Sequence, residues 1–76
     1  MKPTLKDQSG IDITYLVMDG EKVLGRITKG RGSKYPWRSY GASKPNKMLG
    51  SFYPEEGGKK AAIEAVVKAE TPDNGV

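Results

Sequence analysis

The residues of this chain best suited to bind a partner are basic side chains interleaved with aromatic ones. From Lys22 to Pro54 every residue is basic or uncharged, and this window holds eight of the thirteen cations and none of the nine acids. Tyr35, Trp37 and Tyr40 lie inside the same window. Cations neutralise phosphates or an acidic protein surface, and exposed aromatic rings stack on bases. The pattern therefore predicts a binding face with a strong positive field.

Catalytic chemistry has few candidate residues here. The chain contains no histidine and no cysteine, which removes the usual general base, the thiol nucleophile and the usual zinc ligands. Glu55 and Glu56 are neighbours at a predicted helix start, where the helix dipole accounts for them. Residues 30–34, Gly-Arg-Gly-Ser-Lys, lack the spacing of a P-loop. We therefore expect a non-enzymatic binding protein with no catalytic residues, no metal, no cofactor and no small-molecule substrate.

The length bounds the architecture that can carry such a face. A chain of 76 residues forms a single domain with a thin core. No run of about 18 apolar residues is present, and the first residues lack the apolar stretch of a signal peptide. The sequence predicts a cytoplasmic protein without membrane contact. Residues 10–70 are expected to form the domain, with flexible tails at residues 1–9 and 71–76.

The first half of the domain has the pattern of a β-hairpin. Residues 11–18 are β-branched or aromatic at every second position, which is typical of a strand. Asp19-Gly20 follows and predicts a type I′ turn, with positive φ at both central residues. Residues 23–29 then form the second strand.

Two further strands and a helix are expected in the second half. After a flexible connection at residues 30–34, a third strand covers residues 35–40, a breaker-rich turn covers 41–47 and a fourth strand covers 48–53. In the fourth strand either Leu49 or Phe52 faces the helix, or twisting at the end of the strand allows both to do so.

The helix begins at Pro54 or, because Gly57-Gly58 weakens its start, near Lys59. Its solvated ridge holds Lys60, Glu64 and Lys68, and its packing face centres on Ala62, Ala65, Val66 and Ala69. The predicted fold is α+β: a three- to four-stranded antiparallel sheet packed on one C-terminal α-helix, in the order β-β-β-β-α.

One helix covers one face of such a sheet, so the other face is exposed to solvent or contacts a partner. Strand alternation places Arg26 opposite to Ile27, and Arg38 opposite to Trp37. Trp37, the single tryptophan, fits two positions. It belongs either to the core, where large aromatics dominate, or to the binding face beside the cations.

The second half of the chain resembles a known module. Residues 34–40 (Lys-Tyr-Pro-Trp-Arg-Ser-Tyr), a turn, residues 48–52 (Met-Leu-Gly-Ser-Phe) and residues 60–65 (Lys-Ala-Ala-Ile-Glu-Ala) follow the rhythm of three strands plus a helix. The pattern is similar to the plant ethylene-response-factor domain and to the amino-terminal arm-binding domains of phage and transposon integrases. In that family the sheet lies in the DNA major groove, and Arg and Trp side chains contact bases and backbone.

The resemblance extends over about residues 23–69 and implies a set of contacts. Arg26, Lys29, Arg31, Trp37 and Arg38 occupy the contact positions, with Lys44 and Lys47 reaching phosphates. Lys34, a cation of the same window, completes the predicted partner-binding set. Duplex DNA, or another nucleic acid, is the first partner that this set predicts.

A second class of partner is also predicted. The small size and the lack of cofactor ligands resemble accessory proteins of bacteriophages or prophages. Such proteins act as regulators or inhibitors by docking onto a host protein such as RNA polymerase or a nuclease complex. The same basic face would then meet an acidic surface of that host protein.

Overall fold

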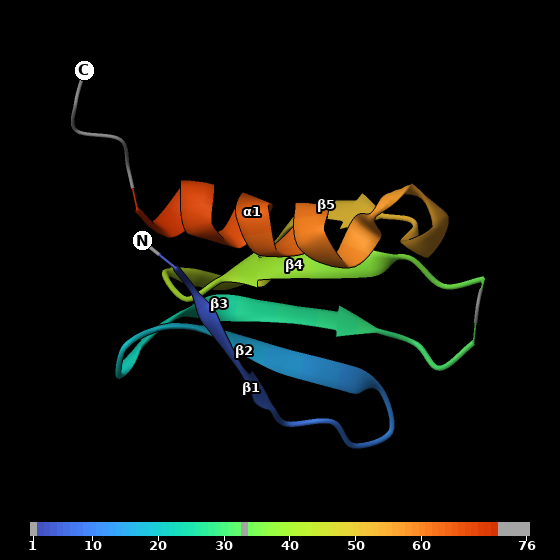
Figure 1. Cartoon of the computed structure of the whole chain (residues 1–76), viewed down its shortest axis with the longest axis horizontal. Helices are drawn as coiled ribbons and strands as arrows, with labels where there is room; N and C mark the ends of the chain where they lie inside the picture. The colour runs from blue at the N-terminus through green and yellow to red at the C-terminus, as the bar shows by residue number, and fades with distance from the viewer. Residues whose placement is uncertain (1, 33, 72–76) are drawn as a thin grey trace.

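The chain folds into one antiparallel sheet with a single helix on one side, as the computed structural model shows for residues 2–32 and 34–71 (Figure 1). The strands follow one another across the sheet in sequence order. The elements are β1 (Thr4–Asp7), β2 (Ile13–Asp19), β3 (Lys22–Lys29), β4 (Trp37–Gly41), β5 (Lys44–Phe52), the short 3-10 turn η1 (Pro54–Glu56) and α1 (Gly58–Glu70). The predicted α+β class is confirmed, but the sheet has five strands rather than three or four.

The additional strand is β1, which lies in the segment predicted as a flexible tail at residues 1–9. It pairs antiparallel with β2, and Leu5 lies opposite the buried Val17. The sequence signal is weak because Leu5 is the only apolar residue of β1. Main-chain pairing with β2 does not depend on side-chain type, so an edge strand can form with little apolar patterning. In the second predicted tail, residues 72–76 lie outside the described part of the chain.

The β2–β3 hairpin is confirmed, with a different turn. Asp19 pairs with Lys22, so the central residues are Gly20 and Glu21 rather than Asp19 and Gly20. Only Gly20 has a positive φ, of 61°. Glycine with positive φ at the first central position alone is the pattern of a type II′ turn, so the predicted type I′ turn is wrong.

The β4–β5 hairpin begins earlier than predicted. Gly41 pairs with Lys44, so the breaker-rich turn shrinks to Ala42-Ser43 and β5 starts at Lys44. The register between the strands skips Leu49 and then residues 45–47. These irregularities fit an edge strand, because Pro45 has no N–H to donate.

The register of β5 also settles which residue faces the helix. Phe52 lies opposite Trp37 and packs against the core, whereas Leu49 is 40% exposed. The prediction that left both residues open is resolved in favour of Phe52.

Helix α1 packs against β3, β4 and β5 and barely reaches β2. Ala62 and Val66 are fully buried, as predicted, and Ala65 is half-buried. Ala69 is exposed, because the buried positions of α1 repeat every four residues, at Gly58, Ala62 and Val66. The close approach depends on Gly25 in β3: a Cβ added there would lie 2.8 Å from Cγ1 of Val66 and 2.1 Å from the carbonyl oxygen of Tyr40. The lysines and glutamate of the predicted solvated ridge are exposed.

The core is one small cluster between α1 and the middle strands. It consists of Val17, Leu24, Ile27, Trp37, Ala62 and Val66. Half-buried side chains from β1, β2, β5 and α1 surround it. Within the part of the chain that the structure describes, no helix is long and apolar enough to cross a membrane.

Candidate functional site

The sheet has two faces, and α1 covers only one of them. Alternate residues of a strand point to opposite sides, and the register aligns them in rows across the sheet. Val17, Ile27 and Trp37 point toward α1. We call the other side the open face. Three rows project from it: Thr4, Met18 and Val23; then Lys6, Leu16, Arg26, Tyr40 and Met48; then Thr14, Thr28, Arg38 and Ser51.

The charge of the open face comes from Lys6, Arg26 and Arg38. Among the described strand residues, no acid belongs to any of its three rows. The Arg26 guanidinium lies 4.1 Å from the centroid of the Tyr40 ring, and its Nη1 donates a hydrogen bond to the carbonyl oxygen of Pro45 at 3.2 Å. These contacts extend the side chain across β4 toward β5. They hold a positive charge over the middle of the face.

The third row is polar along its whole length. The Thr14 and Thr28 hydroxyls lie 3.1 Å apart, and the Thr28 hydroxyl donates to the carbonyl oxygen of Ile13 at 3.0 Å. Arg38 continues this row and is exposed, and no described residue accepts a hydrogen bond from its guanidinium. Arg26 and Arg38 therefore stand in adjacent rows on adjacent strands, about 7 Å apart along the strand direction.

Lys29 does not join them, and its predicted role as a partner contact is corrected. It follows Gly25 and Ile27 on the helix side of β3 and is only 9% exposed. Its ammonium group donates to the carbonyl oxygens of Gly30 and Gly32. The side chain therefore closes the β3–β4 loop, because a buried ammonium needs acceptors. Counting every second residue from Ile27 would have placed Lys29 on the helix side of the sheet.

Trp37 also lies on the helix side. It is 8% exposed and belongs to the core cluster, with its ring centroid 6.2 Å from that of Tyr15. The ammonium of Lys59 lies 4.6 Å from the Tyr15 centroid and covers the outer side of this pair. Of the two positions that the sequence left open for Trp37, the core is correct. Its place in the predicted partner-binding set is wrong, because β4 turns it away from Arg38.

Arg31 connects two loops at one end of the sheet. Its Nη2 donates to the carbonyl oxygen of Gly10 at 3.0 Å and its Nε to that of Ile11 at 3.2 Å. The guanidinium is exposed and holds the β1–β2 loop against the β3–β4 loop. This contact between the two loops was not predicted from the sequence.

A carboxylate with a shifted pKa lies at the end of β1, next to the same loop. The backbone amide of Ser9 donates to the Asp7 carboxylate at 2.8 Å. This bond is the main cause that lowers the pKa of Asp7; the Ser9 hydroxyl and the positive charge of Arg31 add to it, and desolvation opposes it.

The remaining predicted cations are exposed at opposite ends of the sheet. Lys34 lies in the β3–β4 loop, and Lys44 and Lys47 lie near the tip of the β4–β5 hairpin. The predicted set is therefore divided. Arg26 and Arg38 stand together on the open face, and the three lysines border its two ends.

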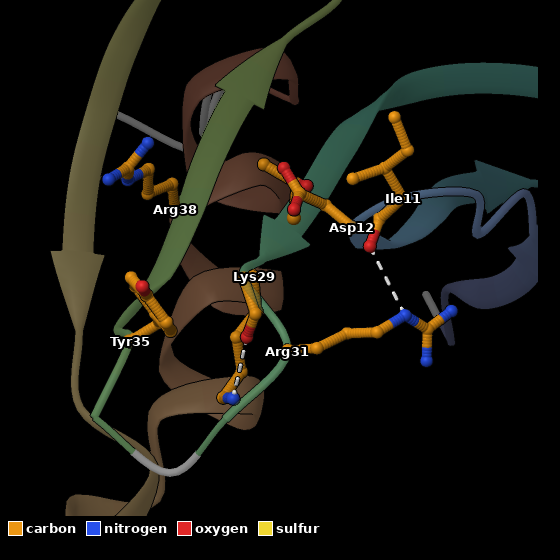
Figure 2. A pocket seen from close by; sticks show the side chains of 8 residues that line it. Ile11, Asp12, Lys29, Arg31, Tyr35 and Arg38 are labelled. Atoms are coloured by element: carbon orange, nitrogen blue, oxygen red, sulfur yellow. Dashed lines mark hydrogen bonds between the residues drawn. The ribbon is translucent and has the colours of Figure 1, made fainter.

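A hollow of about 420 Å³ lies at the loop end of the open face (Figure 2). Arg38 and Thr28 line it from the third row, and Tyr35, Arg31 and Asp12 line it from the loops. It is also lined by Ile11, Lys29 and Gly30. It is wide and open, and it combines an aromatic ring, cations and a single acid.

The opposite end of the open face is apolar. Leu16 and Met18 are half-buried there, and Val23 and Met48 are 39% and 46% exposed. A second hollow of about 160 Å³ begins at Leu16 and Val23 and reaches Pro45. This apolar end was not predicted, although Leu16 and Met18 alternate with the core residue Val17 and so belong to the other face.

Among the described residues, no group of three or more acidic side chains is arranged to hold a metal ion. No family model, curated protein or solved structure matches the chain. The resemblance to ethylene-response-factor and integrase arm-binding domains therefore stays a prediction.

Proposed function

We propose that this protein is a nucleic-acid-binding module whose open face contacts the phosphate backbone. The observation that carries the proposal is the placement of Lys6, Arg26 and Arg38 on the face that α1 leaves uncovered. Phosphate contacts from Arg and Lys supply most of the affinity of such modules. Hydroxyl groups also donate to phosphate oxygens, and the exposed Ser51, which pairs with Arg38 in the third row, provides one.

DNA is the form of nucleic acid that the sequence resemblance favours. The major groove of B-DNA is about 12 Å wide and admits a two-stranded β-ribbon. The β4–β5 hairpin is such a ribbon at the edge of the sheet, with Arg38 in its body and Lys44 and Lys47 near its tip. The rest of the sheet would remain outside the groove.

A binding titration at several salt concentrations tests the proposal. If Lys6, Arg26, Arg38, Lys44 and Lys47 each neutralise one phosphate of a duplex, the slope of log K against log[salt] is about −4.5. Affinity would then fall by about 500-fold between 50 and 200 mM salt. Lack of saturable binding to duplex and single strands below about 100 μM at low salt refutes the proposal, since non-specific binders already reach that range.

Matched charge reversals locate the interface. The double variant Arg26→Glu/Arg38→Glu changes the charge of the open face, and Lys60→Glu/Lys68→Glu makes the same net change on the exposed ridge of α1. Removing two phosphate contacts lowers the steepness of the salt slope by about 2. We expect that loss from the first variant only. Equal losses from both would show that net charge, not the open face, controls binding.

A second candidate function rests on the apolar end of the open face. Exposed apolar side chains at Val23 and Met48 beside Arg26 suit a protein partner with an acidic rim and an apolar centre. We propose this partner, a host protein in a bacteriophage setting, as the alternative. The variant Met48→Lys separates the two. It adds a cation, so it preserves or strengthens nucleic-acid binding, whereas it abolishes capture of a protein from a nuclease-treated bacterial lysate.

A further inference from the structure

The hollow at the loop end of the open face has features that phosphate neutralisation alone does not use. Tyr35 is 51% exposed although it is aromatic. A Cβ added at Gly30 would lie 2.9 Å from Cγ of Tyr35 and 3.1–3.2 Å from its two Cδ atoms. The ring therefore packs directly on the main chain of Gly30, which fixes its position while half of the residue stays in solvent. Exposed, immobilised rings are the platforms on which unpaired bases stack.

The charges around the hollow differ in what they can still bind. Arg31 is held by the carbonyl oxygens of Gly10 and Ile11 and serves mainly to join the loops. Arg38 reaches the hollow from the third row and has no acceptor among the described residues. Figure 2 shows it on the same side of the hollow as Tyr35. A phosphate next to a base stacked on Tyr35 would give Arg38 the acceptor it lacks.

Among the residues that the structure describes, Asp12 is the one acid that lines the hollow. A carboxylate repels phosphate but accepts hydrogen bonds from the amino group of a base. Cytosine carries such an amino group at N4, where thymine has an oxygen. The presence of Asp12 in an otherwise basic hollow therefore favours a base edge with a donor over one with an acceptor.

We propose that the hollow is a single-strand subsite. It takes one unpaired base on Tyr35, with the amino edge of the base toward Asp12 and the adjoining phosphate on Arg38. This inference rests on the proposed function and adds to it a separate mode of binding, to an unpaired strand, with a base preference. A duplex keeps its bases stacked and paired, so it gains only the phosphate contacts of the open face.

The test compares a ten-residue oligo(dC), a ten-residue oligo(dT) and a duplex by fluorescence anisotropy at neutral pH. Tyr35→Ala is expected to raise the Kd for oligo(dC) by about 5- to 150-fold, the range that about 1–3 kcal/mol of stacking gives. The Kd for the duplex stays unchanged. Tyr53→Ala is the matched control, because Tyr53 is 50% exposed and does not line the hollow. Tyr35→Leu replaces the ring by an apolar group that cannot stack on a base. It is measured in place of Tyr35→Ala if the alanine variant does not fold.

The base preference has its own measurement. The wild-type protein should bind oligo(dC) more tightly than oligo(dT), and Asp12→Asn should reduce that ratio. Three outcomes overturn the subsite while leaving the proposed function in place: no effect of Tyr35→Ala, equal loss with Tyr53→Ala, or equal binding of both oligomers. Cytidine monophosphate that competes as well as oligo(dC) would also overturn it, in favour of a mononucleotide site. Failure of wild type to bind any of the three probes removes the proposed function itself.

Discussion

The substitution Gly25→Ala tests how closely α1 lies on the sheet that supports the open face. The added methyl would lie 2.1 Å from the carbonyl oxygen of Tyr40 and 2.8 Å from Cγ1 of Val66. Overpacking a core usually costs about 1–3 kcal/mol. The first contact is to main chain, which no rotamer change relieves, so we expect the upper end of that range, about 3 kcal/mol.

That loss is large for a chain of this size. A domain of 76 residues has a free energy of unfolding of about 4–11 kcal/mol. A loss of about 3 kcal/mol lowers Tm by about 12–24 °C. Urea unfolding followed by the fluorescence of the buried Trp37 measures it directly. Gly10→Ala is the control and should stay within about 0.5 kcal/mol of wild type, because no atom lies within 4 Å of the added Cβ.

A double variant separates the two contacts of Gly25. In Gly25→Ala/Val66→Ala the contact with Cγ1 of Val66 is gone, whereas the contact with the Tyr40 carbonyl remains. We therefore expect no rescue, and a further loss from the cavity at Val66, which is fully buried. A Gly25→Ala protein as stable as wild type would refute the reasoning, and rescue by Val66→Ala would show that the helix, not the neighbouring strand, sets the limit.

Three further predictions concern the end of α1, the carboxylate of Asp7 and the buried Trp37. Glu70 accepts hydrogen bonds from the Ser43 hydroxyl at 2.6 Å and from the Ser43 amide at 3.3 Å. Glu70→Ala should therefore lower the free energy of unfolding in urea by about 1 kcal/mol. A higher free energy of unfolding would show that the unfavourable interaction of an acid with the C-terminal end of a helix dominates. The pKa of Asp7 is lowered in the folded protein. The stability that the contact with Ser9 adds is therefore present above the pKa of Asp7 in the unfolded chain and is lost as the pH falls through its pKa in the folded protein. An NMR titration midpoint of Asp7 at or above that of an unfolded peptide contradicts this. Acrylamide should quench the fluorescence of Trp37 far less in the native protein than in the protein unfolded in urea. Strong quenching of the native protein would place Trp37 outside the core.

The alternation of the strands could be predicted from the sequence wherever both faces carry contrasting residues. Ile27 between Arg26 and Thr28 indicated correctly which side of β3 faces the helix. The same counting extends to Lys29, but its charge suggested a surface position. A local pattern does not show that the carbonyl groups of a nearby loop will satisfy a buried ammonium.

The parts that the sequence did not predict depend on contacts between distant segments. Strand β1 forms because β2 offers a free edge, and β5 starts at Lys44 because irregular pairing accommodates Pro45 at the opposite edge. The loops that line the hollow are joined by hydrogen bonds from Arg31, and the acceptors of these bonds lie twenty or more residues earlier in the chain. Such pairings become visible only once the strands are in register.

The strand order has a consequence for how the chain folds. Each strand pairs with its immediate neighbour in sequence, so the sheet is a continuous meander without a crossover. Every pairing step then closes only a short loop, and the entropic cost of loop closure stays small throughout. The β2–β3 hairpin can form early and the other strands can add to its two sides before α1 docks. We expect single-exponential folding on the order of milliseconds, so that a freshly made chain exposes its unpaired strands only briefly.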